Sequence, residues 1–446
     1  MDFISNQEPQ NREMLAAIGV SSVEDLFETV SAKLRLPRPI HDDGLSEFEG
    51  MKLMEGIAAK NTFPQFDNYL GAGAYEHHVP AIVGMICGKS EFLTSYTPYQ
   101  PEASQGMLQA IFEFQSVLCA LTGLDVSNAS LYDGASACAE ALLMAVRCQK
   151  KRNKALIAQS LHPHYRAVAE QYISSHDIQI ESIAFQSDGQ LDMQALERQL
   201  DENTATILVQ YPSFLGGIDD LKRVSDYAKS KGALTIICAN PLVYGLYASA
   251  QELGADIAVG DCQPFGLPLQ FGGPYVGYIA CRQDLMRQLP GRIVGETVDT
   301  QGRRGFTLTL QAREQHIRRE KATSNICTNQ ALAALASLIS ILWYGKEGVR
   351  RLALTNFQRA AYLRDKLKPL TLVTPFSQTP VFNEFIVKFK RPMAETLKHF
   401  HRHGIHPGVD LGCFYPQLAD HLLVAVTEVK NQSQLDSYCA AAKELI

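Results

Sequence analysis

Four short apolar runs between residues 206 and 281 decide the fold class: TILVQY at 206–211, LTIICA at 234–239, DIAV at 256–259 and YVGYIAC at 275–281. Each is short and almost continuously apolar, which is typical of strands buried on both faces of a parallel sheet. A segment of helical length lies between the first two. The pattern therefore predicts an α/β fold in which helices cover a mostly parallel sheet.

The same rhythm extends in both directions from this stretch. Further strands are expected at 155–158 and 178–185, with helices at 165–174, 193–200 and 221–231. A long apolar helix over 328–344 ends at Gly345. After it we expect a helix at 349–366, a strand at 382–389, a helix at 394–403, a strand at 422–426 and a C-terminal helix. The sequence thus predicts a large sheet domain followed by a small α/β domain.

Residues 1–65 read as a separate helical lead-in. We expect helices at 13–18, 22–33 and 46–60, with Ser22 and Asp25 at the spacing of a capping box, and an extended link at 36–39 around two prolines. Further on, Ser104 can cap a long helix that stops at Thr122-Gly123. The predicted domains are therefore 1–65, 66–345 and 346–446.

Composition limits the classes of function. The chain of 446 residues is 46% hydrophobic and 20% charged, which is ordinary for a globular protein with a large core. Its formal net charge of -6 gives no reason to expect binding to nucleic acid or to a membrane surface. The ten cysteines include no CxxC pair and read as reduced thiols. No run reaches the ~20 apolar residues of a membrane span. We expect a soluble, cytoplasmic protein.

A large α/β domain followed by a small one is the layout of the aminotransferase-like, fold type I enzymes that use pyridoxal phosphate. Such a site needs a Gly- and Ser-rich helix start for the phosphate, an acid for the pyridine nitrogen, a lysine for the Schiff base and a ring that stacks on the cofactor. The segment 133–137, DGASA, opens an Ala-rich helix and fits the first requirement. A close-packed helix start without a ligand explains it about as well.

Two of the four requirements fail. Asn240 follows the strand 234–239 and cannot supply the negative charge. Gln263 or Pro264 stands where the lysine is expected, before the Gly-rich turn at 271–274, and no lysine occurs from Gly232 through Glu320. His162 is either a remnant of the stacking ring or, the reading we favour, an ordinary loop histidine. The sequence predicts a domain that keeps the fold while another chain holds the cofactor.

Three segments resemble those of glycine-cleavage P-proteins: 91–102, EFLTSYTPYQPE; 260–274; and 313–328, REQHIRREKATSNICT. The resemblance spans roughly residues 10 to 440. It is specific to the N-terminal half of the long fused form, which is equivalent to the first subunit of the split bacterial and archaeal form. In that family the lysine belongs to the C-terminal half, so its absence here agrees with the family pattern.

The resemblance implies an activity, a cofactor and partners. A homologous lysine-bearing second subunit would hold pyridoxal 5'-phosphate covalently, in an assembly with two copies of each chain. The enzyme would be a glycine dehydrogenase that decarboxylates glycine and passes the aminomethyl group to the lipoyl arm of the H-protein. Aminotransferase-like dimers build each active site at the subunit interface, so this chain can line the site of its partner.

Two segments are candidates for that lining. Tyr96 and Tyr99, in a loop fixed by prolines, offer aromatic faces and hydroxyl donors; the alternative is a loop that only packs the interface. Thr323, Ser324 and Asn325 lie where relatives often donate a hydroxyl to the partner's cofactor phosphate. A plain helix N-cap explains Ser324 or Asn325 equally well.

A basic cluster between 313 and 321 has two readings. It could attract an acidic surface of the H-protein, although a solvated face or an interface salt-bridge network is the favoured interpretation. The cluster consists of Arg313, His316, Arg318, Arg319 and Lys321.

No metal is expected, because the pairs His77-His78, His162/His164 and His401/His403 lack the accompanying ligands of a zinc site. Two other functions stay open: a self-sufficient pyridoxal phosphate enzyme that uses an unexpected lysine, and a scaffold that only stabilises its partner.

Overall fold

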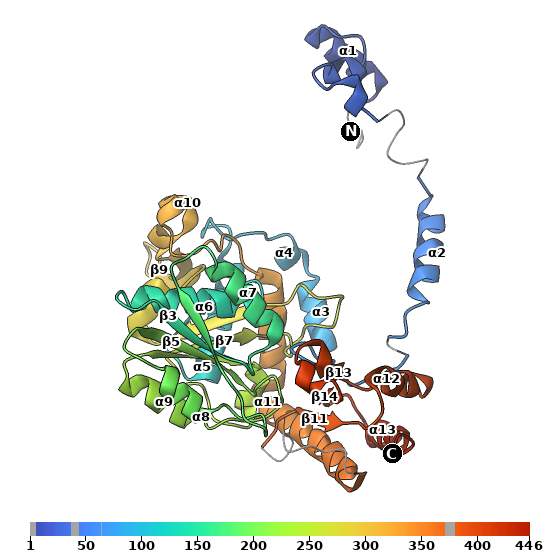
Figure 1. The fold of residues 1–446 in the computed structure, drawn as a ribbon. Coiled ribbons are helices and arrows are strands. Elements are labelled where there is room, and N and C mark those ends of the chain that lie inside the picture. Colours follow the sequence, from blue (N-terminus) through green and yellow to red (C-terminus); the bar gives the residue numbers. More distant parts are fainter. Residues whose placement is uncertain (1–5, 37–43, 64, 371–379) are drawn as a thin grey trace. The chain divides into compact units, whose positions relative to one another are not determined.

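The computed structural model describes residues 6–36, 44–63, 65–370 and 380–446 (Figure 1). Contacts along the chain separate it into two units, Met1–Thr62 and Phe63–Ile446. The division into three domains stays a prediction, including the boundary expected after residue 345.

The N-terminal unit contains two helices, α1 (Glu8–Ile18) and α2 (Glu47–Ala58). A capping box at Ser46 begins α2, as the predicted helix over 46–60 requires. The helix predicted over 22–33 is wrong. Ser22 and Asp25 do exchange hydrogen bonds, but only the 3-10 helices Glu24–Phe27 and Ala32–Leu34 follow, because Thr29, Val30 and Ser31 are poor helix formers. Most of the predicted link at 36–39 lies outside the described residues.

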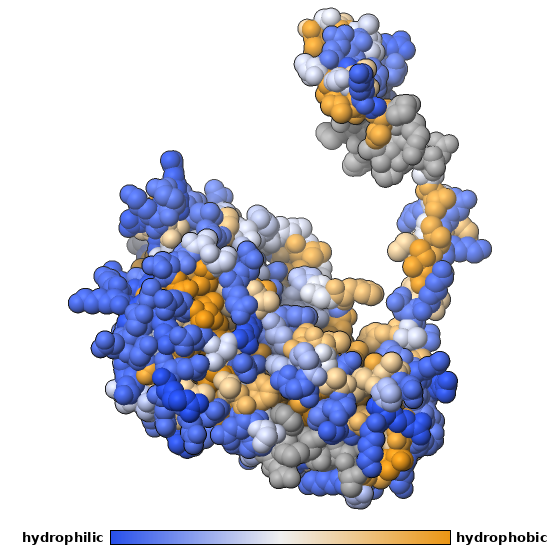
Figure 2. Space-filling model, viewed as in Figure 1, coloured by the Kyte–Doolittle hydropathy of each residue, from blue (hydrophilic) through white to orange (hydrophobic). Residues whose placement is uncertain are grey.

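None of the described side chains in this N-terminal unit is buried. The helix α2 exposes apolar residues along its length, seen as orange atoms in Figure 2: Phe48, Met51, Leu53, Met54 and Ile57. A monomeric soluble protein rarely leaves such a set without a covering surface.

In the second unit the largest sheet of the described residues has seven strands in the order β2-β8-β7-β6-β5-β3-β4. The strands are β2 (Val126–Ser127), β3 (Lys154–Ala158), β4 (Gln179–Ile183), β5 (Thr204–Tyr211), β6 (Leu234–Ala239), β7 (Ile257–Asp261) and β8 (Gly277–Cys281). The pairings from β4 through β7 are all parallel, and β8 is antiparallel to both β7 and β2. The mostly parallel sheet is thus confirmed.

Helices cover both faces of this sheet, because alternate strand residues enter different cores (Figure 1). Ile207 and Ile237 pack with the helices α5 (Gln105–Thr122), α8 (Met193–Gln199), α9 (Leu221–Ser230) and α11 (Ala331–Leu367). Leu208 and Ile236 pack with α6 (Gly134–Cys148) and α7 (Pro163–Ile173). The result is a three-layer structure with the carboxyl ends of the parallel strands meeting at one edge.

The ends of α5 test the predicted caps. Gly123 ends the helix in the left-handed region with a φ of 75°, as Thr122-Gly123 predicts. Ser104 occupies the N-cap position, but its side chain makes no capping hydrogen bond. The helix therefore begins where it was expected, but the predicted side-chain cap by Ser104 is wrong.

The C-terminal part begins along α11, which kinks at Gly345 with a φ of 62° and a ψ of 179°. A three-stranded sheet of β11 (Glu384–Lys388), β14 (His421–Ala425) and β13 (Val409–Asp410) packs with α12 (Met393–Arg402) and α13 (Gln432–Lys443). The hairpin of β9 (Ile293–Val298) and β10 (Arg304–Thr309) was missed, because its sequence is charged and lacks an apolar run.

One described helix, spanning Ala331–Leu370, is long and apolar enough to cross a membrane by length and composition alone. Within its most apolar window, 44% of the residues are buried. Its first half packs in the core with α5, and a buried core helix passes the same test.

Candidate functional site

The carboxyl ends of β6 and β7 meet the start of α6 at the place where the fold would hold a cofactor. A cavity of about 30 Å³ lies there, lined by residues that include Tyr75, His162, Tyr165, Asn240, Asp261 and Pro264. That volume suits a single water molecule and not an aromatic cofactor. A shallower depression of about 360 Å³ lies over the same helix start. The inner cavity is small because the chain's own side chains fill it.

Asp261 occupies the phosphate position at the start of α6. One carboxylate oxygen accepts from the backbone N–H of Gly134 at 3.1 Å and the other from that of Gln263 at 2.8 Å. Asp133 and Ser136 form a capping box that takes a further N–H of the same turn. N–H groups at a helix start are what binds phosphate in nucleotide and cofactor sites. Burial raises the pKa of Asp261 to about 7.

Tyr165 fills the space beside this helix start. Its hydroxyl oxygen would lie 2.6 Å from a Cβ placed on Gly134. Its ring stacks on that of His162, with centroids 4.5 Å apart and an interplanar angle of 16°. His162 Nε2 lies 2.7 Å from the carbonyl oxygen of Ala72, and burial lowers the pKa of His162 to about 4. His162 lines the pocket, and its Nδ1 accepts from the backbone N–H of His164 at 3.1 Å as the N-cap of α7. Both readings of His162, as an ordinary loop residue and as a remnant of the stacking ring, stay predictions.

Gln263, at the expected lysine position, is a fully buried structural residue. Its side-chain oxygen accepts from the backbone N–H of Tyr75 at 2.9 Å. Its amide nitrogen donates to the carbonyl oxygens of Tyr75 at 2.8 Å and Leu267 at 2.9 Å. All of its strong hydrogen-bonding capacity is thus used within the chain, and an amide cannot form an imine.

A second buried carboxyl group, Glu384 of β11, fixes the loop that forms another wall of the pocket. Its two oxygens accept from the backbone N–H of Ala72 and from the hydroxyl of Tyr75, both at 2.8 Å. Burial raises the pKa of Glu384 to about 7. A Cβ on Gly71 would lie 2.5 Å from this carboxyl group, so the close approach requires glycine at that position.

The pocket lacks two groups that pyridoxal phosphate requires. Asn240 caps its own turn by accepting from the N–H of Leu242 at 3.0 Å, and it carries no charge for a pyridine nitrogen. Neither Gln263 nor Pro264, the two residues at the expected lysine position, can form an imine. Asp261 also accepts from the N–H of Gly134 where the fold would bind phosphate, and Tyr165 fills the adjoining space. The residues present do not fit a covalently bound cofactor.

The second region of interest is the loop of Tyr96 and Tyr99, whose exposed fractions are 80% and 52%. The hydroxyl oxygen of Tyr99 accepts from an Nη of Arg292 at 2.7 Å. The guanidinium carbon lies 5.0 Å from the Tyr99 ring centroid, which is cation–π geometry. Tyr96 projects further into solvent. Only Tyr99 is fixed by a buried charged group.

Arg292 is the centre of a polar cluster behind Tyr99. It donates to the side-chain oxygen of Asn329 at 3.3 Å, and its Nε lies 3.8 Å from a carboxylate oxygen of Glu314. Burial raises the pKa of Glu314, against the attraction of Arg292. His316 lies edge-on to Tyr99, with centroids 6.5 Å apart. Arg292 was not among the predicted site residues, because a single arginine before a strand forms no pattern.

The predicted residues Thr323, Ser324 and Asn325 line a separate depression of about 700 Å³. Ser324 Oγ accepts from the backbone N–H of Ile326 at 3.0 Å, and Thr323 Oγ1 lies 3.4 Å from the carbonyl oxygen of Arg313. The alternative reading of Ser324 or Asn325 as a helix N-cap is wrong, because the N-cap of α11 is Gln330. Their role toward a partner stays a prediction.

The basic cluster is only partly available to other molecules. Arg313 donates to the carbonyl oxygen of Gly291 at 2.8 Å, and Arg318 donates to that of Ala312 at 2.8 Å. Arg319 and Lys321 are exposed. Two of the cluster's arginines are thus held by their own chain.

The architecture defines a class of protein, the aminotransferase-like fold type I of pyridoxal-phosphate-dependent enzymes. A NifS-like protein superposes with a TM-score of 0.63 at 12% identity, covering 85% of this chain and 98% of that one. A sphingosine-1-phosphate lyase of Burkholderia pseudomallei gives 0.67 at 14% identity, covering 93% of each. At such low identity these likenesses show the fold alone.

Closer relatives identify the family. The family model described as glycine cleavage system P-protein matches residues 1–441. A probable glycine dehydrogenase (decarboxylating) subunit 1 of Protochlamydia amoebophila is 61% identical over 100% of both chains. The counterpart of Brevibacillus brevis is 47% identical, covering 98% of this chain and 97% of that one. A crystal structure of inhibitor-bound glycine decarboxylase (P-protein) superposes with a TM-score of 0.90 at 39% identity over 100% of both chains. The chain belongs to the glycine cleavage system P-protein family.

Proposed function

We propose that this chain is the subunit of a heteromeric glycine decarboxylase that does not itself hold the cofactor. A homologous second subunit carries the lysine and the pyridoxal phosphate, and two copies of each chain assemble. This chain lines the partner's active site. After decarboxylation of glycine, the aminomethyl group passes to the lipoyl arm of the H-protein.

The observation that carries the proposal is the filled pocket. Asp261 accepts from the N–H of Gly134 at the helix start that would bind phosphate, and Gln263 or Pro264 stands where the imine-forming lysine is expected. A family member with this pocket has to obtain cofactor chemistry from another chain. The relatives' name, subunit 1, supports the existence of a second subunit.

The Tyr99 cluster suits a role across a subunit boundary. Because the hydroxyl oxygen of Tyr99 accepts from Arg292, its own hydrogen can be donated to a group outside the chain. Arg292 is buried and holds the ring in place, so the donor is oriented before the partner binds. In this proposal Tyr99 positions substrate or cofactor by hydrogen bonding, and Tyr96 supplies an aromatic wall.

Mixing the separately purified subunits tests the proposal. The assay measures release of CO₂ from glycine with lipoylated H-protein and pyridoxal phosphate present. We expect no activity from this chain alone and activity from the mixture, which should elute as an assembly of both chains. Decarboxylation by this chain alone would overturn the proposal in favour of a self-sufficient enzyme.

A further inference from the structure

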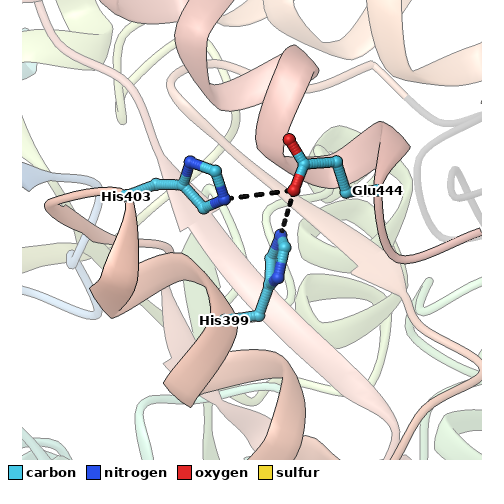
Figure 3. Close-up of side chains that lie close together, drawn as sticks. All are labelled: His399, His403 and Glu444. Atoms are coloured by element: carbon cyan, nitrogen blue, oxygen red, sulfur yellow. Dashed lines mark ion pairs between the residues drawn. The ribbon is translucent and has the colours of Figure 1, made fainter.

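Four histidines lie close together in the sequence of the small domain, at 399, 401, 403 and 406. His399 and His403 are separated by one helical turn on α12 and therefore share a face. Figure 3 shows that both rings point to one carboxylate oxygen of Glu444, which follows the end of α13. The Nε2 atoms of His399 and His403 lie 3.7 and 3.2 Å from that oxygen.

We propose that His399, His403 and Glu444 bind a divalent transition-metal ion, with Zn²⁺ as the best match. Two imidazole nitrogens and one carboxylate oxygen are a ligand set that zinc accepts, with water in the fourth position. Neighbouring ligand atoms of a tetrahedral site with bonds of about 2.0–2.1 Å are about 3.3–3.4 Å apart. The two measured distances bracket this value, and all three ligand atoms lie within 4.8 Å of one another.

The exposure of the three side chains suits an accessible site. His399 is 17% exposed, His403 38% and Glu444 57%, so the ion can enter from solvent and water can complete its coordination. The Nε2 of His399 lies 3.0 Å from the carbonyl oxygen of Ala441 and donates to it when protonated there. Metal binding replaces this hydrogen bond, with the ring in its Nδ1–H tautomer.

The ion would join the ends of α12 and α13, which pack against each other in the small domain. None of its ligands belongs to the filled pocket or to the Tyr99 cluster, so its expected effect is on stability. The expectation of no metal rested on three histidine pairs, of which His401/His403 is the one in this region. Residues two apart point to different sides of a helix, whereas the matching pair is His399/His403 and the third ligand lies far along the chain.

The test is a zinc titration of the full chain after treatment with a chelator, followed by competition with a chromophoric zinc indicator. We expect the unaltered chain to bind one equivalent of Zn²⁺ saturably. His403→Ala and Glu444→Gln should each weaken this binding at least ~10-fold, since even the loss of an outer partner of a ligand costs about 10–100-fold. Zinc should raise the thermal midpoint of the unaltered chain and not that of His403→Ala.

His401→Ala is the matched control, because His401 lies on the same helix but outside the three ligands. The His401→Ala variant should still bind one equivalent of Zn²⁺. Binding of one Zn²⁺ that is retained in both His403→Ala and Glu444→Gln would overturn the proposal. Loss of Zn²⁺ binding in His401→Ala would also overturn it. The second result would place the ion on His401 and His406, whose Nε2 and Nδ1 are 3.3 Å apart. Absence of any saturable equivalent would leave these residues as an ion-pair cluster only.

Discussion

The pocket at the sheet edge and the cluster around Tyr99 use polar residues in opposite ways. In the pocket, Asp261 and Glu384 are buried and accept hydrogen bonds from their own chain. In the cluster, buried Arg292 donates to the hydroxyl oxygen of Tyr99, a residue that is about half exposed. The polar groups of the pocket are therefore satisfied within the chain, whereas the role that we propose for Tyr99 is toward another molecule.

Arg292→Ala should give the largest effect. Its removal takes away the buried cation that acts most strongly on the carboxyl group of Glu314, and breaking a buried pair costs about 3–5 kcal/mol. We expect the free energy of unfolding in denaturant to fall by this amount. Arg292→Lys should recover part of it, because lysine keeps the charge but loses the forked geometry. A loss below about 1 kcal/mol would show that the cluster is not held by Arg292.

Glu384→Gln tests whether the carboxyl groups of the pocket are structural. Folding raises the pKa of Glu384 from 4.5 to about 7, so the folded state holds this proton more tightly. The stability it contributes is therefore present below pH about 4.5 and is lost as pH rises through about 7. Glutamine does not ionise, and it can accept from Ala72 N–H and donate to Tyr75 oxygen.

Between pH 5 and pH 8 the unaltered chain should therefore lose about 2–3 kcal/mol more of its free energy of unfolding than Glu384→Gln does. Denaturant unfolding at both pH values measures this difference. Parallel pH profiles for the two proteins would refute the role given to Glu384.

Asp261→Ala tests the hydrogen bonds that the pocket makes at the start of α6. It leaves the N–H groups of Gly134 and Gln263 without their acceptor, and with water entering the vacated space we expect a loss of about 2 kcal/mol. Inorganic phosphate should raise the thermal midpoint of the variant and not that of the unaltered chain. Equal shifts of the thermal midpoint with phosphate in the two proteins would argue against the idea that Asp261 occupies the place of a phosphate.

Tyr99→Phe and Tyr96→Phe form a matched pair with the smallest effects on stability. Removing the Tyr99 hydroxyl should cost about 1 kcal/mol, because one hydrogen bond to Arg292 is lost, whereas Tyr96→Phe should stay within about 0.5 kcal/mol. In the assembled enzyme, Tyr99→Phe should lower glycine turnover at least ~10-fold if its hydroxyl is used in the partner's site. Unchanged assembly with unchanged turnover in both variants would favour the scaffold alternative.

The sequence predicts those parts of the fold whose burial is uniform. The strand β6 begins and ends at Leu234 and Ala239 as expected, because a strand covered on both faces is an uninterrupted apolar run. The hairpin of β9 and β10 is partly exposed and charged, so it carries no such signal. Tertiary packing and not local pattern decides these strands.

The absence of the lysine was readable from the sequence, but the filling of the pocket was not. Tyr165 and Asp261 approach Gly134 from other segments of the chain, and Glu384 comes from β11, far along the sequence. Residue types alone do not show such contacts. Tyr96 and Tyr99 were predicted from their chemistry, but no local pattern indicates that Arg292 supports only Tyr99.

The most direct test of the division of labour is to locate the cofactor covalently. The assembled enzyme is reduced with borohydride, the two chains are separated, and each is measured by mass spectrometry. We expect a pyridoxyl mass on the second subunit and none on this chain. A pyridoxyl-modified lysine in this chain would contradict it.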